Sequence, residues 1–380
     1  MIYLDHNATT PVLPEVREAM LPYLSDEWGN PSSSYRFGSK LKSVMERARE
    51  QVADLIGAKS TREIIFTSGG TESNNTAIHS AIMAQPEKRH IVTSQVEHSS
   101  VLTYCRYLEQ YHGYRVTYLP VDREGLLSMK DLENAIATDT ALVSLMWANN
   151  ETGVLFPVAE IAALCRNRGL LYHCDAVQAV GKMNVDLGSF PCDYLSLTGH
   201  KIGAAKGVGA LYIHRAALFF PMLHGGHQER SRRGGTENVA SIAGLGAAAS
   251  IALEKLPYYE SSVRTLRDSL EEGVLKTIPG TERNGHKDLR LANTTNIAFS
   301  GIESEALLIL LDQSDVFASS GSACLADSPD PSHVIAAMKQ GAAARQSIRF
   351  SLGAADSTSD VVRSISACGE AWAALRMLNS

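Results

Sequence analysis

The chain has 380 residues, enough to bury a large core and to form two domains. It is 44% hydrophobic and 20% charged, and its formal net charge is −6, which gives no reason to expect a surface for nucleic acid or for an anionic membrane. No uninterrupted apolar run reaches transmembrane length, and residues 1–7 lack the basic start and apolar stretch of a signal peptide. We therefore expect a cytoplasmic protein.

The first part of the chain predicts helices and one strand–loop–helix unit. Residues 1–15 are expected to be extended or irregular, and helices are expected at 14–24 and 39–56. A strand at 63–67, a loop at 68–73 and a helix at 74–83 follow. Small residues and hydroxyls before a helix expose its first N–H groups, a pattern that favours either a phosphate site or a plain helix cap.

The middle of the chain alternates apolar strands with helices, which predicts a mainly parallel sheet covered by helices. The expected strands are 90–94, 115–119, 141–147, 170–174, 194–197 and 209–213, with a clear helix at 157–168. Ligands on such sheets bind at the carboxyl ends of the strands. Polar clusters stand at four of these ends, at 95–98, 149–153, 175–178 and 198–201.

The last part of the chain predicts a smaller α+β unit. The polar segment 223–238 is too long for a simple connector, so we expect it to be functional or to face a partner. A helix at 239–254 should end before Pro257, which we interpret as a domain boundary. Beyond it we expect helices at 259–277, 303–312, 332–339 and 357–377 and strands at 293–299, 316–319 and 346–351. The prediction is an α/β chain with a large domain of residues 16–257 and a small domain of residues 1–15 and 258–380.

Lys201 follows one of the apolar strands and is either an exposed loop charge or a lysine that forms a Schiff base. The other strand ends favour the second interpretation. Asp175 could pair with a protonated ring nitrogen and Gln178 with a ring oxygen, while His98 could stack on the ring or move protons. The helix start at Gly70 and Thr71 could hold a phosphate. Pyridoxal 5′-phosphate needs this combination of groups.

The six cysteines form no C-x-x-C pair, so we expect neither a zinc nor a cluster framework, and no metal site. Five of them lie in apolar or mixed segments and are expected to be buried and inert: Cys105, Cys165, Cys174, Cys192 and Cys368. Cys324 lies among small, polar turn residues. From the residues alone it is either an exposed nucleophile or an unreactive surface thiol.

Ten short stretches, in order along nearly the whole chain, resemble cysteine desulfurases of the NifS and IscS branch, within the pyridoxal-phosphate fold-type I class. They are residues 3–10, 29–33, 66–73, 97–98, 149–153, 175–178, 199–201, 233–238, 319–324 and 348–353. The resemblance implies a homodimer that converts L-cysteine to L-alanine. It also implies that the sulfur passes to an acceptor protein, such as an iron–sulfur scaffold or a thiolation enzyme.

The resemblance also implies a role for each matching residue. Lys201 would hold the cofactor as an imine and move the substrate's α-proton, and Cys324 would take the sulfur as a persulfide. Asp175 would pair with the ring nitrogen, Gln178 with the ring oxygen, and His98 would lie over the ring. The remaining implied contacts are Gly70, Thr71, Thr198 and His200 at the phosphate, Thr236 at the phosphate of the other subunit, Asn150 at the cofactor and the substrate, and Arg349 and Asn30 at the substrate.

Several positions depart from the pattern of these enzymes. Tyr35 stands where a histidine is usual, Gly203 where a bulkier residue is usual, Ala205 where proline is usual, and Ala354 and Ala355 where an arginine and an aromatic are common. These departures put loop geometry, rate and partner choice in doubt rather than the reaction class. A selenocysteine lyase or an aminotransferase of the same fold remains an alternative. So does an inactive sulfur-relay subunit, although such proteins usually lose the lysine or the cysteine.

Overall fold

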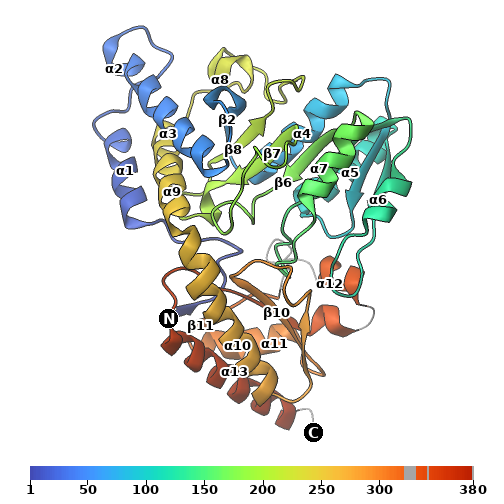
Figure 1. Ribbon diagram of the computed structural model, residues 1–380. Coiled ribbons are helices and arrows are strands. Elements are labelled where there is room, and N and C mark those ends of the chain that lie inside the picture. The colour runs from blue at the N-terminus through green and yellow to red at the C-terminus, as the bar shows by residue number, and fades with distance from the viewer. Residues whose placement is uncertain (321–330, 340–341, 379–380) are drawn as a thin grey trace.

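The computed structural model describes residues 1–320, 331–339 and 342–378. Figure 1 shows a larger unit, built around a broad sheet, above a smaller unit that contains both ends of the chain. A long helix runs down one side and joins the two units. The larger unit carries the predicted polar strand ends, so its sheet determines where a site can form.

The larger unit has a seven-stranded sheet in the order β2-β8-β7-β6-β5-β3-β4. Its strands are β2 (Ile64–Thr67), β3 (His90–Ser94), β4 (Arg115–Leu119), β5 (Thr140–Met146), β6 (Leu171–Asp175), β7 (Tyr194–Thr198) and β8 (Gly209–Ile213). Only β8 runs antiparallel to its neighbours, and every other pair is parallel. The predicted mainly parallel sheet is therefore confirmed, and the ends of β5, β6 and β7 meet at one edge.

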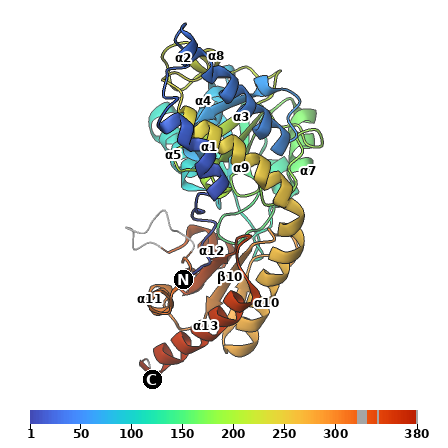
Figure 2. The same ribbon diagram turned by 90° about the vertical axis from the view of Figure 1, so that its left-hand side faces the viewer.

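Helices cover both faces of this sheet. They are α1 (Pro14–Leu24), α2 (Arg36–Ser39), α3 (Leu41–Leu55), α4 (Gly70–Ala84), α5 (Ser99–His112), α6 (Met129–Ala135), α7 (Val158–Arg168), the short α8 (Gln228–Ser231) and α9 (Val239–Tyr258). Helices α1 and α3 lie side by side with α9 (Figure 2), and α4 packs on the opposite face against β7 and its neighbours.

The start of α4 differs from the prediction. The helix begins at Gly70, one turn before residue 74, because residues 70–73 adopt helical geometry instead of forming a loop. Gly70 and Thr71 are thus the first helical residues, and Asn74 lies on the turn above them. This shift brings Asn74 within reach of the sheet edge.

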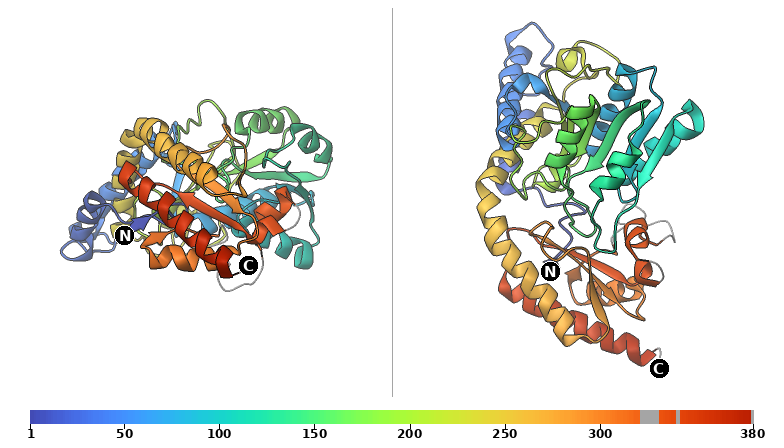
Figure 3. Two further views of the ribbon diagram at one scale, coloured as in Figure 1. Left: turned by 90° about the horizontal axis from the view of Figure 1, so that it is seen from below. Right: turned by 45° about the vertical axis from the view of Figure 1, so that its right-hand side comes forward.

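The smaller unit is built on a three-stranded antiparallel sheet with β10 (Thr294–Phe299) between β9 (Thr281–Asn284) and β12 (Ser347–Ser351). The N-terminal β1 (Ile2–Tyr3) pairs in parallel with β11 (Val316–Phe317). The helices are α10 (Arg264–Thr277), α11 (Ser304–Gln313), α12 (His333–Met338) and α13 (Thr358–Leu378). Figure 3 shows α13 running along the outside of this unit, where it packs against α10 and α11.

The prediction that a helix ends before Pro257 is wrong. The helix runs unbroken from Val239 to Thr277, and a π turn at Tyr259–Val263 joins α9 to α10. Proline removes one backbone donor from a helix, and here the π turn follows two residues after Pro257. By length and composition alone this helix could cross a membrane, but 56% of its most apolar window is buried. Its packing against α1 and α3 is that of a core helix.

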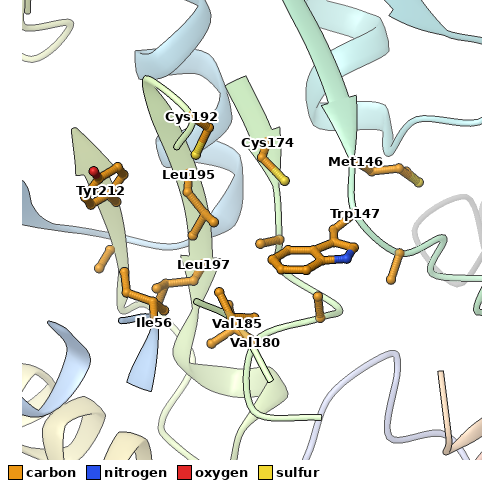
Figure 4. Packing of buried hydrophobic residues seen from close by; sticks show 14 of the residues in the cluster. Ile56, Met146, Trp147, Cys174, Val180, Val185, Cys192, Leu195, Leu197 and Tyr212 are labelled. Carbon is orange, nitrogen blue, oxygen red and sulfur yellow. The ribbon is translucent and has the colours of Figure 1, made fainter. Parts of the chain in front are cut away.

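Within the described residues, the buried hydrophobic side chains form three clusters. The largest lies between the sheet and the α1, α3, α9 layer, where Figure 4 shows Cys174 and Leu195 on neighbouring strands and Trp147 beside them. Trp147 meets Phe190 edge to face at 4.4 Å. A second cluster lies under α4 and α5, and the third fills the smaller unit and includes the N-terminal Ile2 and Leu4. Helix α12 packs into the largest cluster and so ties the smaller unit's chain to the larger core.

Candidate functional site

A cavity of about 570 Å³ opens at the sheet edge where β5, β6 and β7 end, a size typical of small-molecule sites. It brings together ten of the residues singled out from the sequence, although they are spread over most of the chain. These are Gly70, Thr71, His98, Asn150, Asp175, Gln178, Thr198, His200, Lys201 and Arg349.

Three of the predicted site residues do not belong to this cavity as described. Asn30 lies exposed in the loop after α1, where its Oδ1 accepts the N–H of Ser32 at 2.8 Å. Thr236 is exposed in the segment 223–238. Cys324 falls within residues 321–330 and lies outside the described residues.

The N-terminus of α4 forms an anion cradle at one end of the cavity. Gly69 precedes the helix at φ 152°, a conformation that side chains rarely adopt, and it provides no side-chain cap. The first N–H groups of a helix have no acceptor within it, and they carry the positive end of the helix dipole. The cradle therefore offers backbone donors to a phosphate.

His200 and Thr198 add side chains to the same end of the cavity. Burial, and then the nearby charges of Lys201 and Lys206, lower the pKa of His200 to about 4. The ring is consequently neutral at neutral pH, and its Nδ1 lies 3.2 Å from the hydroxyl of Thr9. The hydroxyl of Thr198 is buried and donates to the carbonyl of Val208 at 3.3 Å.

Asp175 lies at the end of β6 and is held by donors from α4 and from the following turn. Its Oδ2 accepts the side-chain amide of Asn74 at 2.7 Å, and its Oδ1 accepts the N–H of Val177 at 3.0 Å. The Asn74 amide also donates to the hydroxyl of Ser100 at 2.8 Å. Asn74 was not predicted from the sequence, because its partner Asp175 is 101 residues away.

His98 is oriented by the start of α5. Its Nδ1 accepts the backbone N–H of Ser100 at 3.1 Å, so the neutral ring carries its proton on Nε2. Because Ser100 also accepts from Asn74, one chain of hydrogen bonds connects His98 with Asp175. The acid and the ring are thus fixed relative to each other.

Glu97, next to His98, is fully buried. Burial raises its pKa to about 8, and the nearby charge of Asp175 acts in the same direction. Its Oε1 accepts from the hydroxyl of Ser94 at 2.7 Å and from the N–H of Met146 at 3.0 Å. We infer that Glu97 is protonated at neutral pH and carries no charge into the site.

Lys201 lies in a short 3₁₀ turn, Gly199–Lys201, directly after β7. Its Nζ donates to the backbone carbonyls of Asn7 at 2.5 Å and of Ala8 at 2.6 Å. The Nε2 of Gln178 donates to the same Asn7 carbonyl at 3.1 Å. The N-terminal segment therefore forms one wall of the site, a part that the sequence patterns left without a role.

Arg349 comes from β12 of the smaller unit and is 2% exposed. Its guanidinium donates to Asp5 Oδ1 at 2.6 Å and to the carbonyl of Asn150 at 3.0 Å. Arg349 was predicted to bind a substrate carboxylate, whereas its pairing with Asp5 was not predicted. An incoming carboxylate would therefore meet an arginine that is already paired.

Ion pairs anchor the segment 223–238, and one of them reaches the cradle at the start of α4. Glu229, Arg230 and Ser231 adopt positive φ angles of 46°, 59° and 63°, which non-glycine residues rarely do. The buried carboxylate of Glu229 holds this turn, since it accepts Arg49 at 2.7 and 2.9 Å and the N–H of Phe66 at 2.9 Å. Further along, Arg233 pairs with Glu72, in the first turn of α4, at 2.9 Å.

The five cysteines predicted to be inert are buried and free, as expected. Burial raises the pKa of each thiol, to about 12 for Cys105, Cys165 and Cys368 and further for Cys174 and Cys192. None of the five is available as a thiolate at neutral pH.

Three of the unusual positions meet behind Lys201. Gly203, at φ 88°, leaves no room for a side chain, because a Cβ there would lie 2.6 Å from Leu13. Together with Ala354 and Ala355 it lines a second cavity of about 150 Å³ that also contacts Lys201. These departures therefore change the packing behind the lysine and leave the polar groups of the larger cavity in place.

Comparison with known proteins gives one consistent result. The family model of class-V aminotransferases matches residues 2–363. The chain is 50% identical to a protein named cysteine desulfurase from Trichormus azollae, over 100% of this chain and 94% of that one. It is 50% identical to a cysteine desulfurase named NifS from Azotobacter vinelandii, over 92% and 87%. A solved structure of a NifS-like protein superposes with a TM-score of 0.91 at 35% identity, covering 97% of this chain and 98% of that one.

Proposed function

The chain belongs to the class-V aminotransferase family, and from that membership and the geometry of its cavity we propose that it is a cysteine desulfurase. It removes sulfur from L-cysteine, releases L-alanine and keeps the sulfur as a persulfide for transfer. The observation that carries the proposal is the convergence of a lysine, a carboxylate, an amide and a helix N-terminus on one cavity.

The residues of this cavity fit pyridoxal 5′-phosphate. The open N-terminus of α4 with Gly70, Thr71, Thr198 and His200 would bind the phosphate. Asp175, which is buried and holds two hydrogen bonds, would receive the ring nitrogen. Gln178 would donate to the ring oxygen, and His98 would lie over the ring beside Asn150. When bound, the cofactor supplies an aldehyde that condenses with amines and a ring that accepts the electron pair of a breaking bond.

Different side chains of the cavity would then transfer the proton and bind the substrate. Lys201 Nζ would hold the cofactor at rest and, as a free amine, would move the proton at Cα of the substrate. The Asn7 and Ala8 carbonyls accept the amine when it is not bonded to the cofactor. Arg349 binds the substrate carboxylate in place of Asp5, with Asn150 beside it.

Cys324 is the proposed sulfur acceptor, an assignment that comes from its sequence context. As a thiolate it forms a bond to the substrate sulfur while the Cβ–S bond breaks, and alanine leaves after a proton returns to Cβ. The five other thiols are too buried and too weakly acidic for this role.

We further propose a homodimer in which Thr236 reaches the phosphate of the partner and Asn30 helps to bind substrate. Within each chain, residues 16–257 would form the cofactor-binding domain, and residues 1–15 with 258–380 the domain that carries Cys324. The protein would act in the cytoplasm and pass its sulfur to an iron–sulfur scaffold or a thiolation enzyme.

Reduction of the purified protein with borohydride, followed by digestion and mass spectrometry, tests the cofactor assignment. We expect a pyridoxyl group on the peptide that contains Lys201. A second sample, treated with L-cysteine and alkylated, should carry an additional sulfur on Cys324. A pyridoxyl group on another lysine would overturn the site, and sulfur on another cysteine would overturn the assignment of the acceptor.

A further inference from the structure

A second lysine, Lys182, lies buried next to the cavity and has no role in the proposed reaction. It is 1% exposed, and its Nζ donates to Asn7 Oδ1 at 2.7 Å and to Gln178 Oε1 at 2.7 Å. Both acceptors are neutral, and no ion pair within residues 1–320, 331–339 and 342–378 involves Lys182. Burying an amine without a carboxylate is costly, so its presence here calls for a function.

The contact with Lys182 determines which way the Gln178 amide points. A side-chain amide has an acceptor on one side and two donors on the other, and Lys182 donates to the acceptor side of Gln178. With Oε1 facing Lys182, Nε2 must face the opposite way, toward the Asn7 carbonyl at 3.1 Å and the cavity. The Asn7 carbonyl accepts only and favours the same orientation, so Lys182 and Asn7 hold the two sides of the amide together.

Lys182 also fixes the segment that receives Lys201. It holds the side chain of Asn7, whose backbone carbonyl accepts both Lys201 and Gln178. On its other side, Asn7 donates to Thr294 at 2.9 Å and to the carbonyl of Asn150 at 3.2 Å. One buried amine therefore connects two groups that would touch the cofactor.

The electrostatic surroundings of Lys182 are consistent with this arrangement. Burial, and then the charges of Lys201 and Arg349, hold its pKa well below its usual value. Lys182 in turn contributes to lowering the pKa of His6 to about 4, after the larger effect of burial. A positive charge on any of these groups disfavours a proton on its neighbours.

We propose that Lys182 is a positioning residue of the cofactor site, which turns the N–H donors of Gln178 toward the ring oxygen and holds the carbonyl that receives Lys201. The proposal rests on the proposed function, because it requires pyridoxal phosphate in the cavity.

Titration of the apoprotein with pyridoxal phosphate, followed by intrinsic fluorescence, gives the first test. Lys182→Met should raise the dissociation constant about 10- to 100-fold, the range expected when a hydrogen bond to a charged group is lost. Lys130→Met, an exposed lysine on α6, is the matched control and should bind as the unaltered protein does. If the unaltered protein binds no pyridoxal phosphate, the proposed function fails. If the unaltered protein binds it and Lys182→Met binds it equally tightly, the proposal for Lys182 fails.

A double-variant cycle separates positioning from a general structural role. If Lys182 acts through Gln178, then Lys182→Met combined with Gln178→Ala should weaken binding by less than the product of the two single effects. Losses that multiply in full would overturn the proposal.

The visible absorption band of the loaded enzyme gives a spectroscopic readout. Lys182→Met and Gln178→Ala should both move the pH midpoint of this band upward, because each weakens the donation of a hydrogen bond to the ring oxygen. If Lys182→Met does not fold, Lys182→Gln keeps one donor and should show an intermediate weakening and shift. A midpoint and an affinity equal to those of the unaltered enzyme would overturn the proposal.

Discussion

The sheet edge and the segment 223–238 meet at the start of α4 but are held in different ways. At the edge, Asp175 and His98 accept hydrogen bonds from neutral amides, and Lys201 donates to backbone carbonyls, all on regular strands and turns. The segment 223–238 is fixed by the buried Arg49–Glu229 pair and the Arg233–Glu72 pair, and its backbone is strained at three successive residues. We therefore expect substitutions at the sheet edge to lower catalytic turnover more than stability. Substitutions in the segment 223–238 should lower the free energy of unfolding more than turnover.

The largest expected effect is at the edge. Lys201→Ala should lower desulfurase turnover by about 10⁴-fold or more, because it removes the group that holds the cofactor and moves the proton. The visible band of the purified protein should disappear, while its thermal unfolding should change little. A variant that kept the band would place the cofactor on another lysine.

The next largest effect is in the segment. Arg49→Met leaves the Glu229 carboxylate buried without its partner, so the free energy of unfolding should fall by about 3–5 kcal/mol. Arg17→Met is the matched control, because Arg17 is exposed and its pair with Glu18 should contribute less than about 1 kcal/mol. Equal losses in urea unfolding of the two variants would contradict the role assigned to Glu229.

A smaller, pH-dependent effect belongs to Glu97. Its pKa is about 8 in the folded chain and near 4.5 when unfolded, so the unfolded chain binds fewer protons between these values. Stability should therefore fall as the pH rises from 4.5 toward 8. Glu97→Gln keeps the shape of the side chain and should remove this part of the decline. Parallel pH profiles of chemical unfolding for the two proteins would contradict a protonated Glu97.

The smallest effect is expected from Thr236. Thr236→Ala should weaken cofactor binding by about 3- to 10-fold, as expected for one neutral hydrogen bond, and leave unfolding unchanged. In mixed dimers of a Thr236→Ala chain and a Lys201→Ala chain, the loss of cofactor affinity should appear only at the site that the altered threonine faces across the interface. A loss confined to the altered chain's own cavity would contradict the proposed crossing.

The sequence predicted the strand ends well because the physics there is local. Apolar strands in alternation with helices determine a parallel sheet, and such a sheet gathers the residues after its strands at one edge. The positions of Asp175, Lys201 and His98 at this edge therefore followed from the predicted strand ends alone. The composition around each cysteine also predicted the buried thiols, since all five lie in apolar or mixed segments.

The remaining contacts depend on pairs that are distant in the sequence. Asn74 meets Asp175 across 101 residues, and Arg49 meets Glu229 across 180. The predicted helix end before Pro257 was wrong, because the helix continues through the π turn that follows the proline. Lys182 gave no signal, since a lysine on a turn is ordinarily exposed, and only its two buried acceptors distinguish it.

The most direct test of the central claim is the product formed from L-cysteine. The purified protein, loaded with pyridoxal phosphate, should release alanine and sulfane sulfur in equal amounts, and Cys324→Ser should stop both. Keto-acid formation from L-cysteine, or alanine formation that persists without Cys324, would contradict the proposal that this cavity serves a cysteine desulfurase.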